Sequence, residues 1–554
     1  MNRYALLLSF ALFGFAVHAQ DGAPQSHSEP RMDLRKFAEY NLFVDGNGDG
    51  VVDDTEDKRS PEAKRRLASL RKGVRVMKSR KPSDPKSWFF QSAIHGVTDQ
   101  AIIEAAERDP DIANVQREMF WNRCPHNGEP SADFLVWHRA YLYYFERILR
   151  EAADDPTLSV PYWNYTGEDL SFPLAFARRE AAQGDIIPRN PLWASDREAA
   201  FVVGRTGLTA KVTTEAFDNL MAETQLFGPS EDTGFAGGVY DDTPGTMGMI
   251  ERRPHNDIHV AIGGVIGDDF NGLMAEVRTA AFDPIFWVHH SNIDRIFAIW
   301  DATPGKTWGY FPDASWFAER PWYFHDTDGS IKNEQRMFYL NGKNLNVAYD
   351  DVDVSASTLT EAPPFDLKQT NVMLATLPKN FQLNEATGNP TSSLEPLCDC
   401  CREKGVEATL SADTATEFEL NIVGSASESQ KLMGLAATVE RPKRGPQTML
   451  EITFIPPKYA PNVGYEVFLK IGQSKEISVG SLSLFGVKHH AEHSEQDSNT
   501  VTQRMNITKA INDVTDDGGL KVVIKPYSLF SESGDPAARR GGDIGVTNIA
   551  IKVE

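Results

Sequence analysis

The stretches PHNDIH at 254–259 and DPIFWVHHSNIDRIFAIW at 283–300 decide the architecture of this 554-residue chain. His255 and His259 are four residues apart, so on a helix their imidazoles lie on the same face. The second stretch has helical apolar spacing and carries two adjacent histidines. These patterns predict helices that bring His255, His259 and one histidine of the pair to a single metal ion.

A third helical stretch, DFLVWHRAYLYYFERIL at 133–149, carries His138, and His95 and His126 precede it. The chain thus offers two sets of three histidines without Cys, Asp or Glu among them. Neutral imidazole suits copper, zinc, iron and nickel, and all-histidine pairs with open positions favour copper. A single histidine is more often a hydrogen-bonded core residue, but six in aromatic surroundings favour metal binding. Asn256 stands where the zinc protease motif H-E-x-x-H requires glutamate.

The chain resembles the tyrosinases, catechol oxidases and haemocyanins, which hold two coupled copper ions. SWFFQSAIHG at 87–96, CPH at 124–126, MIERRPHNDIHVAIGG at 249–264 and PYWNY at 161–165 are similar to segments of that family, as are the stretches quoted above. The resemblance covers about residues 75–350. It implies that copper A is held by His95, His126 and His138, and copper B by His255, His259 and His290. It leaves His289 as a residue that packs beside the ligands, and His126 and His138 stand farther apart than in many members.

The resemblance also implies an activity. Two copper ions that share O2 would oxidise phenols and o-diphenols to o-quinones, with a small phenolic compound as substrate. A haemocyanin-like oxygen carrier is the alternative, and a zinc hydrolase is disfavoured because no carboxylate ligand accompanies the histidines. Glu251 and Asn256 resemble a pair that orients a water molecule, which would take the phenol proton as a general base. Alternatively, the Asn256 side chain could only cap a helix or form a hydrogen bond with the backbone. Val277 stands where members carry a gate residue, which implies an open path to copper A.

The four cysteines fall in two regions, and each region suggests a chemical role. Cys124 and His126 have the C-x-H spacing of the fungal relatives, in which a thioether joins the two side chains; a buried free thiol is the other interpretation. Cys398, Cys400 and Cys401 form a CDCC cluster. In an oxidising compartment two of the three could form a disulfide, whereas thiolates also bind copper(I), so the cluster could receive copper and deliver it to the histidines. The third possibility is that the cluster neither forms a disulfide nor handles copper.

Composition and the N-terminus point to an exported protein. The net charge is -22, which argues against nucleic acid and anionic membranes as partners. Residues 1–19 have the arginine, the apolar core and the small-residue end of a signal peptide, so export to the periplasm or the outside is expected. A membrane anchor is the rival interpretation, but the apolar core is shorter than the ~20 residues that span a bilayer. No later stretch is long and apolar enough to span one.

DGNGDGVVDDTE at 45–56 fits a calcium-binding EF-hand loop at each key position. The expected ligands are the side chains or carbonyls of Asp45, Asn47, Asp49, Val51, Asp53 and Glu56. MDLRKFAEYNLF before the loop suits an entering helix, and the next helix is expected to restart at Pro61. A surface loop rich in Asp and Gly is the alternative.

The stretches 353–369 and 384–396 are polar and contain proline, as linkers do, and from about residue 405 short alternating runs separated by Gly, Pro and Asp appear. Such runs predict a β-sandwich or jelly roll. GYEVFLKIGQSKEISVGSLSLFG at 464–486 resembles the C-terminal domain of plant polyphenol oxidases, which implies a cover over the copper pocket that an activating protease removes by cutting within 353–404. KHHAEH at 488–493 suits a solvated loop better than a metal site.

The expected fold is therefore a mainly α catalytic core, in which a four-helix bundle holds two copper ions, with a C-terminal β domain and a small EF-hand-like segment. The expected divisions are 1–19 signal peptide, 20–74 EF-hand-like segment, 75–352 dinuclear copper domain, 353–404 linker and 405–554 β domain.

Overall fold

The computed structural model describes most of the two expected domains. The described residues are 30–34, 61–125, 132–167, 169–177, 190–202, 206–228, 233–238, 247–266, 270–310, 316–317, 322–353, 357, 359, 388–390, 408–410, 412–420, 448–471, 476–486, 500–512, 520–531 and 544–553. The expected signal peptide, the EF-hand-like loop, His126, the CDCC cluster and the KHHAEH loop lie outside them.

Four helices carry most of the candidate histidines: α3 (Trp88–His95), α6 (Asp133–Ala153), α10 (Asp257–Gly263) and α11 (Ile285–Ala302). His255 lies in the π-helical turn Glu251–Asn256 just before α10. The long helices α6 and α11 cover the stretches predicted at 133–149 and 283–300, and they pack against each other. Almost every residue of α11 is buried, because its apolar side chains lie on all faces of the helix. Asp154, the residue just after α6, adopts the left-handed conformation with φ 53° and ends the helix.

Shorter elements complete the helical part. Its other helices are α2 (Pro61–Ser79), α4 (Asp99–Arg108), α5 (Arg117–Phe120), α7 (Leu174–Ala177), α8 (Ala199–Val202), α9 (Thr214–Ala222) and α13 (Arg336–Leu340). Three strand pairs accompany them: β1 (Gln225–Phe227) with β4 (Thr307–Gly309), β2 (Val265–Ile266) with β3 (Phe270–Asn271), and β5 (Phe324–His325) with β6 (Ile331–Lys332). α2 begins at Pro61, as predicted. It crosses the expected division at 74 and packs on α6, so it belongs to the helical part.

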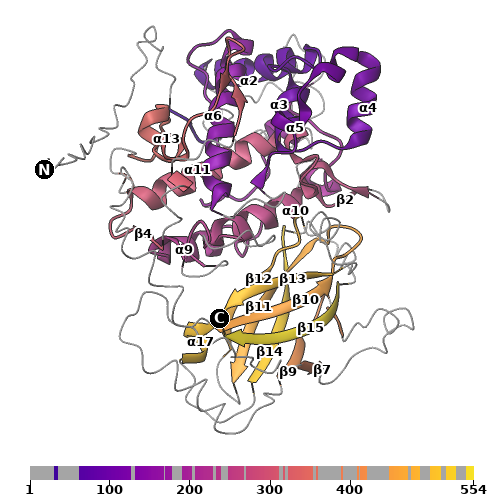
Figure 1. Ribbon diagram of the computed structural model, residues 1–554, viewed down its shortest axis with the longest axis vertical. Helices are drawn as coiled ribbons and strands as arrows, with labels where there is room; N and C mark the ends of the chain where they lie inside the picture. The colour runs from indigo at the N-terminus through magenta and orange to yellow at the C-terminus, as the bar shows by residue number, and fades with distance from the viewer. Residues whose placement is uncertain are drawn as a thin grey trace, which may run out of the picture.

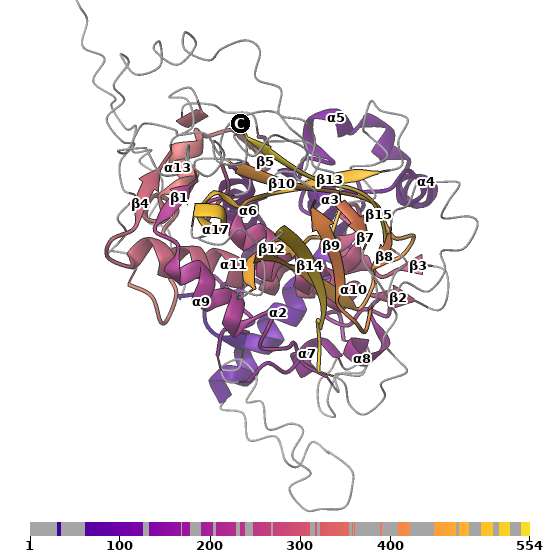
Figure 2. The same ribbon diagram turned by 90° about the horizontal axis from the view of Figure 1, so that it is seen from below.

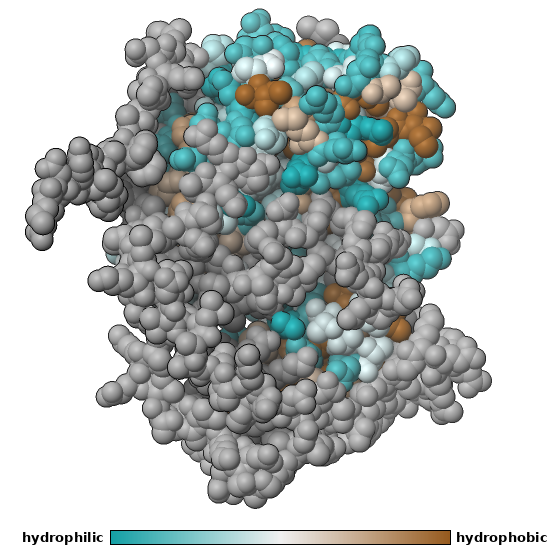
Figure 3. Space-filling view, viewed as in Figure 1, coloured by the Kyte–Doolittle hydropathy of each residue, from teal (hydrophilic) through white to brown (hydrophobic). Residues whose placement is uncertain are grey.

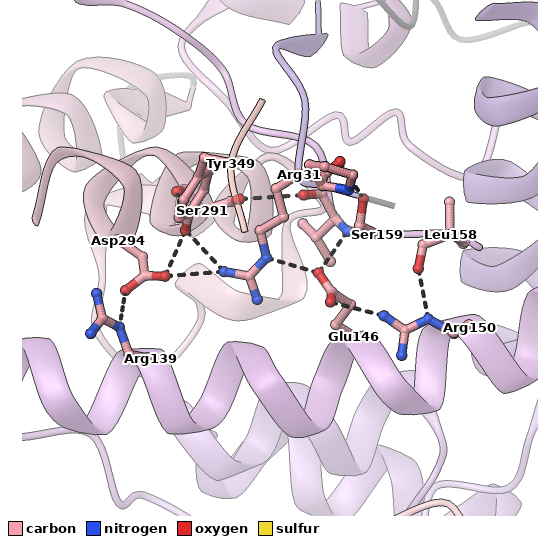
Figure 4. Close-up of polar contacts among 11 residues, drawn as sticks. Arg31, Arg139, Glu146, Arg150, Leu158, Ser159, Ser291, Asp294 and Tyr349 are labelled. Atoms are coloured by element: carbon pink, nitrogen blue, oxygen red, sulfur yellow. Dashed lines mark hydrogen bonds and ion pairs between the residues drawn. The ribbon is translucent and has the colours of Figure 1, made fainter. Parts of the chain in front are cut away.

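A buried ion network ties the N-terminal segment 30–34 into this helical part (Figure 4). Arg31 bonds Glu146 of α6 through Nε at 2.8 Å and Asp294 of α11 through Nη1 at 3.1 Å. The Tyr349 hydroxyl donates to Asp294 at 2.6 Å, and Arg139 bonds the other oxygen of that carboxylate. Each charge is paired, which offsets the cost of removing it from water. The network holds α6 and α11 together beside the histidines they carry.

The C-terminal part is a sandwich of two antiparallel sheets. One sheet has the order β13-β10-β15-β8 and the other β12-β11-β14-β9-β7. Their strands are β7 (Gly388–Pro390), β8 (Ala408–Leu410), β9 (Thr416–Leu420), β10 (Thr448–Ile455), β11 (Val463–Ile471), β12 (Ile477–Leu482), β13 (Val501–Asn506), β14 (Leu520–Ser528) and β15 (Ile544–Val553), with the short helix α17 (Thr508–Asn512) after β13. The predicted β-sandwich is confirmed in these residues. β7 pairs with β9 although the sequence placed 388–390 in the linker.

The sandwich lies directly against the helical part (Figure 1). The ends of β12 and β13 point toward α10, and the view from below shows β12 and β14 projected over α10 and α11 (Figure 2). Backbone bridges join the parts as well, since Leu208 pairs with Phe530. The β domain therefore covers the side of the helical part that carries His255 and His259.

The described surface on the face shown in Figure 3 is mostly hydrophilic, with small hydrophobic groups between polar ones. Ile103, Phe270 and Ile331 are the large apolar side chains exposed among the described residues. None of the helices in the described part of the chain has the length and apolarity to cross a membrane.

Candidate metal centre

The structure gathers two groups of buried histidines between α3, α6, α10 and α11. In each group one ring nitrogen per histidine lies within 4.8 Å of the others. The groups share His290, and their members are His95, His138 and His290 for the first, and His255, His259, His289 and His290 for the second. Five of the six predicted ligands are thus brought together, and the sixth, His126, lies outside the described residues.

The rings approach one another closely. His138 and His290 stack in parallel with centroids 4.2 Å apart, and Nε2 of His290 lies 3.3 Å from Nε2 of His255. The His255 and His259 centroids are 4.5 Å apart, which confirms that the two residues face the same side. His95 completes the first group, 5.6 Å from His138.

Backbone carbonyls orient three of the rings. Nδ1 of His138 donates to Phe134 O at 2.7 Å, one helical turn earlier in α6. Nδ1 of His259 donates to Met274 O at 2.8 Å, and Nδ1 of His95 to Val277 O at 2.9 Å. Such a bond fixes the tautomer and leaves the Nε2 lone pair available for a metal.

His255 is oriented by a side chain instead. Its Nδ1 lies 2.7 Å from Oδ1 of the neighbouring Asn256, which accepts the ring proton. Asn256 therefore sets the tautomer of a predicted copper-B ligand, a role that the sequence did not indicate.

One segment, residues 272–277, holds a histidine of each group, because Met274 and Val277 both belong to it. Glycines permit its close approach to the helices. A methyl group on Gly96, just after α3, would stand 2.7 Å from Val277 O, and one on Gly263 would stand 2.1 Å from Ala275 N. These contacts are closer than any Cβ tolerates, so only glycine allows the carbonyls of this segment to reach the rings.

Two histidines of the centre, His289 and His290, are neutral at ordinary pH. Burial lowers the pKa of His289 to about 3, and burial with the surrounding histidines lowers that of His290 well below its usual value. Both groups of ligand atoms consist of imidazole alone among the described residues. Neutral imidazoles without carboxylates fit copper, and the convergence of Nε2 atoms fits a pair of such ions.

The β domain contributes residues at this centre. Phe485, which is 1% exposed, stacks on the His259 ring with centroids 4.2 Å apart and meets the edge of His255 at 5.8 Å. Ser483 Oγ accepts a hydrogen bond of 2.6 Å from Nδ2 of Asn256. An aromatic ring and a hydroxyl of the cover thus touch the predicted copper-B residues directly.

Further contacts fasten the cover to the same helical turn. Arg252 donates to the Ser481 carbonyl at 3.0 Å. The Tyr527 hydroxyl donates to Asp257 at 2.6 Å, and the guanidinium of Arg253 lies over the Tyr527 ring at 4.5 Å. Every one of these side chains is buried or partly buried, so the contacts are shielded from salt.

The remaining predicted residues lie as follows. Val277 is 1% exposed, and its carbonyl, described above, orients His95. Glu251 is 4% exposed and belongs to the π-helical turn Glu251–Asn256 that precedes α10. Cys124 is buried, and its Sγ lies 3.8 Å from Nε2 of His138.

The sequence did not indicate that Phe485 and Ser483 contact the metal centre. It also did not indicate that a ring nitrogen of His289 lies with those of His255, His259 and His290. The quoted segment 464–486 contains both residues of the cover, in SLSLFG after β12. Strand alternation predicts a sheet, but it does not indicate which end of the sheet docks on a helix.

Comparison with known proteins agrees with this geometry. Residues 85–303 match the family described as the common central domain of tyrosinase. A tyrosinase of Hahella sp. is 26% identical over 495 residues, which are 83% of this chain and 93% of the relative. A chloroplastic polyphenol oxidase of Malus domestica is 28% identical over 297 residues, 51% of this chain. The chain spans about half the length of the curated plant relatives it matches, 46% in that case.

Solved structures share the whole arrangement. Latent apple tyrosinase superimposes with a TM-score of 0.52 at 18% identity, covering 96% of this chain and 98% of that one. A latent aurone synthase, also a polyphenol oxidase, gives a TM-score of 0.51 at 15% identity, covering 96% and 90%. Because these solved structures are at most 18% identical to the chain, the superpositions show a shared fold alone. The similarity to tyrosinases and polyphenol oxidases rests on the sequence matches. Residues 85–303 therefore carry a tyrosinase-type central domain, and the chain is similar over most of its length to a tyrosinase and over about half of it to polyphenol oxidases.

Proposed function

We propose that this protein oxidises phenols and o-diphenols to o-quinones with O2. The convergence of buried imidazoles in two groups that meet at His290 carries this proposal. His95, His126 and His138 would hold copper A, and His255, His259 and His290 copper B. Copper bound there would supply the electron transfer between the phenol and O2.

The residues of the chain itself would bind and orient the phenol. Aromatic rings such as Phe134, 4.7 Å from His255, pack beside the histidines and would exclude water around the substrate. We infer that Glu251 and Asn256 orient a water that takes the phenol proton, once the Nδ2 group of Asn256 is released from Ser483. Val277 is inferred to border the path to copper A.

The test is quinone formation from tyrosine and L-DOPA, before and after limited proteolysis. Turnover that rises after cleavage supports the oxidase. Reversible O2 binding without turnover after cleavage would instead support the haemocyanin-like carrier.

We infer that the chain is made as a latent proenzyme. The support is the contact of Phe485 with His259 and the likeness of the fold to latent relatives. An activating protease would cut within 353–404 and release the β domain. Mapping the cut that coincides with a gain of turnover tests this; a gain with the chain intact would contradict it.

We infer a thioether between Cys124 and His126. It would hold the His126 ring in place, and the support is the C-x-H spacing and the position of Cys124 beside the first histidine group, 3.8 Å from Nε2 of His138. The S–H and a ring C–H bond break as the S–C bond forms, and O2 would take up the two electrons and two protons. Intact-mass measurement of the copper-loaded chain exposed to O2 should show the loss of two hydrogen atoms, and the Cys124→Ser variant should not. An unchanged mass would contradict the crosslink.

The CDCC cluster is inferred to handle copper before it reaches the histidines, with a disulfide as the other possibility. A variant with Cys398, Cys400 and Cys401 all replaced by serine should load less copper than the wild type. Equal loading would end the delivery hypothesis.

Calcium is inferred at the loop 45–56, where it would be structural in an exported protein that meets high calcium. Calcium should raise the melting temperature of the wild type, and the Glu56→Gln variant should respond less, because it loses the bidentate ligand. An unchanged melting temperature on chelation would contradict the calcium site.

Export itself is inferred from residues 1–19, and cell fractionation with N-terminal sequencing of the mature chain would test it.

A further inference from the structure

The ring of His255 is oriented in a different way from the other oriented rings of the centre. Backbone carbonyls of the helical part orient His95, His138 and His259. Nδ1 of His255 instead lies 2.7 Å from Oδ1 of the Asn256 side chain. The chain itself holds a backbone carbonyl in place, whereas a side-chain amide can rotate. The orientation of His255 therefore depends on what holds Asn256.

The other end of the Asn256 amide is held largely from the β domain. Its Nδ2 group donates to Oγ of Ser483 at 2.6 Å and to the sulfur of Met247 at 3.2 Å. A thioether sulfur accepts hydrogen bonds only weakly, so the hydroxyl of Ser483 provides the stronger bond. Asn256 and Ser483 are both buried, so breaking their bond would leave an amide proton unpaired away from water.

Gln503 of β13 holds Ser483 in turn. Its side chain is one of the two buried positions of that strand, where a β-sandwich usually places apolar groups. A buried amide must find partners, and both ends of this one find them on a single residue. Oε1 of Gln503 accepts from the Ser483 N–H at 2.9 Å, and Nε2 donates to the Ser483 carbonyl at 2.5 Å.

This amide also joins the two sheets of the β domain. Strand β13 is at the edge of one sheet, and β12, which Ser483 follows directly, is at the edge of the other. The ends of these two strands point toward α10 (Figure 1). Gln503 therefore fixes the position of Ser483 at the place where the sandwich meets the metal centre.

We propose that Gln503 and Ser483 are positioning residues for copper B, because they hold Asn256 and, through it, the His255 ring that presents Nε2 to the metal. This inference rests on the proposed function, since it takes His255 as a copper ligand. The β domain then supports the metal centre as well as covering it. The effect is confined to one of the two ions, because carbonyls of the helical part orient the rings at copper A.

Copper release from the full-length chain tests the proposal. The chain is loaded with copper(I) and exposed to a chelator of that ion, and the copper that remains is counted against time. In Ser483→Ala one ion should leave about three- to tenfold faster than in the wild type, a smaller effect than loss of a direct partner of a ligand, because Met247 still contacts the amide. Anomalous diffraction of a half-released sample should show the remaining ion beside His95 and His138.

Gln503→Met tests the same chain of contacts from farther away. Methionine is similar in length to glutamine but makes neither bond to Ser483, so it should accelerate the release of the same ion. Ser478→Ala and Gln100→Met make the same chemical changes at exposed positions and should release copper as the wild type does. Unchanged release in Ser483→Ala or Gln503→Met, or equal acceleration of both ions, would overturn the proposal.

The side-chain amide signal of Asn256 provides a measurement without copper. In 15N spectra of the copper-free, full-length chain it is identified by its loss in Asn256→Asp. The signal should shift in Ser483→Ala and in Gln503→Met and stay in place in the two controls. A chain that binds no copper would refute the proposed function, whereas two bound copper ions with an unchanged amide signal in these variants would refute this inference alone.

Discussion

The contact of Phe485 with the His259 ring predicts that one side chain controls access to the copper site. Phe485→Ala removes a phenyl ring that is 1% exposed. Burial of such a ring is worth about 2–3 kcal/mol, so its loss should shift the ratio of covered to uncovered chain by about 30- to 150-fold. Turnover of L-DOPA by the uncut protein should rise by up to that factor, and the further gain on proteolysis should shrink correspondingly.

Matched variants separate this effect from a general loss of stability. Phe468→Ala deletes the same group from a partly exposed position in the β domain, where the ring packs against Lys525 at 4.8 Å. It should leave the turnover of the uncut chain at the wild-type level. Phe485→Leu keeps most of the buried area and should give a smaller rise than alanine. The reasoning is refuted if Phe485→Ala remains as inactive as the wild type before cleavage and is activated by the same factor after it.

Three further outcomes are expected. Gly263→Ala would place a methyl group 2.1 Å from a backbone nitrogen, so copper retention during dialysis should fall by about tenfold or more, whereas Gly342→Ala, with open space around it, should retain copper normally. Arg31→Ala removes one of two arginine partners from each of the buried carboxylates Glu146 and Asp294, so it should lower the unfolding free energy of the copper-free protein by about 2–3 kcal/mol in denaturant titrations. Arg65→Ala removes an exposed arginine with two acidic partners and should cost at most about 1 kcal/mol; equal losses would contradict the account. Burial lowers the pKa of His325 from 6.5 to about 4, so its contribution to stability is complete above pH 6.5 and declines as the pH falls toward 4, by about 3 kcal/mol at most. The difference in melting temperature between wild type and His325→Phe should change over that range, and a constant difference would contradict the assignment.

Much of the fold could be predicted because the patterns are strong and local. Helical apolar spacing around His138 and His290 placed α6 and α11, and TMLEITFI at 448–455 coincides with β10. Histidine type and spacing, together with the family resemblance, likewise indicated the five candidate ligands that the described residues bring together. These features depend on periodicity and on the chemistry of one residue type, both of which are visible in a sequence.

Contacts through the backbone and between distant segments could not be predicted. Met274 and Val277 orient histidines through their carbonyls, so their side chains give no signal. Arg31 lies 263 residues from Asp294 in the sequence, and nothing near it marks a buried ion pair. Phe485 follows a strand like many other apolar residues, and only the docking of the β domain gives it a role.

Copper content, measured together with the positions of the ions, tests the central claim most directly. The full-length chain, produced with ample copper and freed of loosely bound metal, should contain two copper ions. Anomalous diffraction should place one beside His95 and His138 and the other beside His255 and His259. A single tightly held ion, or two ions bound elsewhere on the chain, would contradict the account.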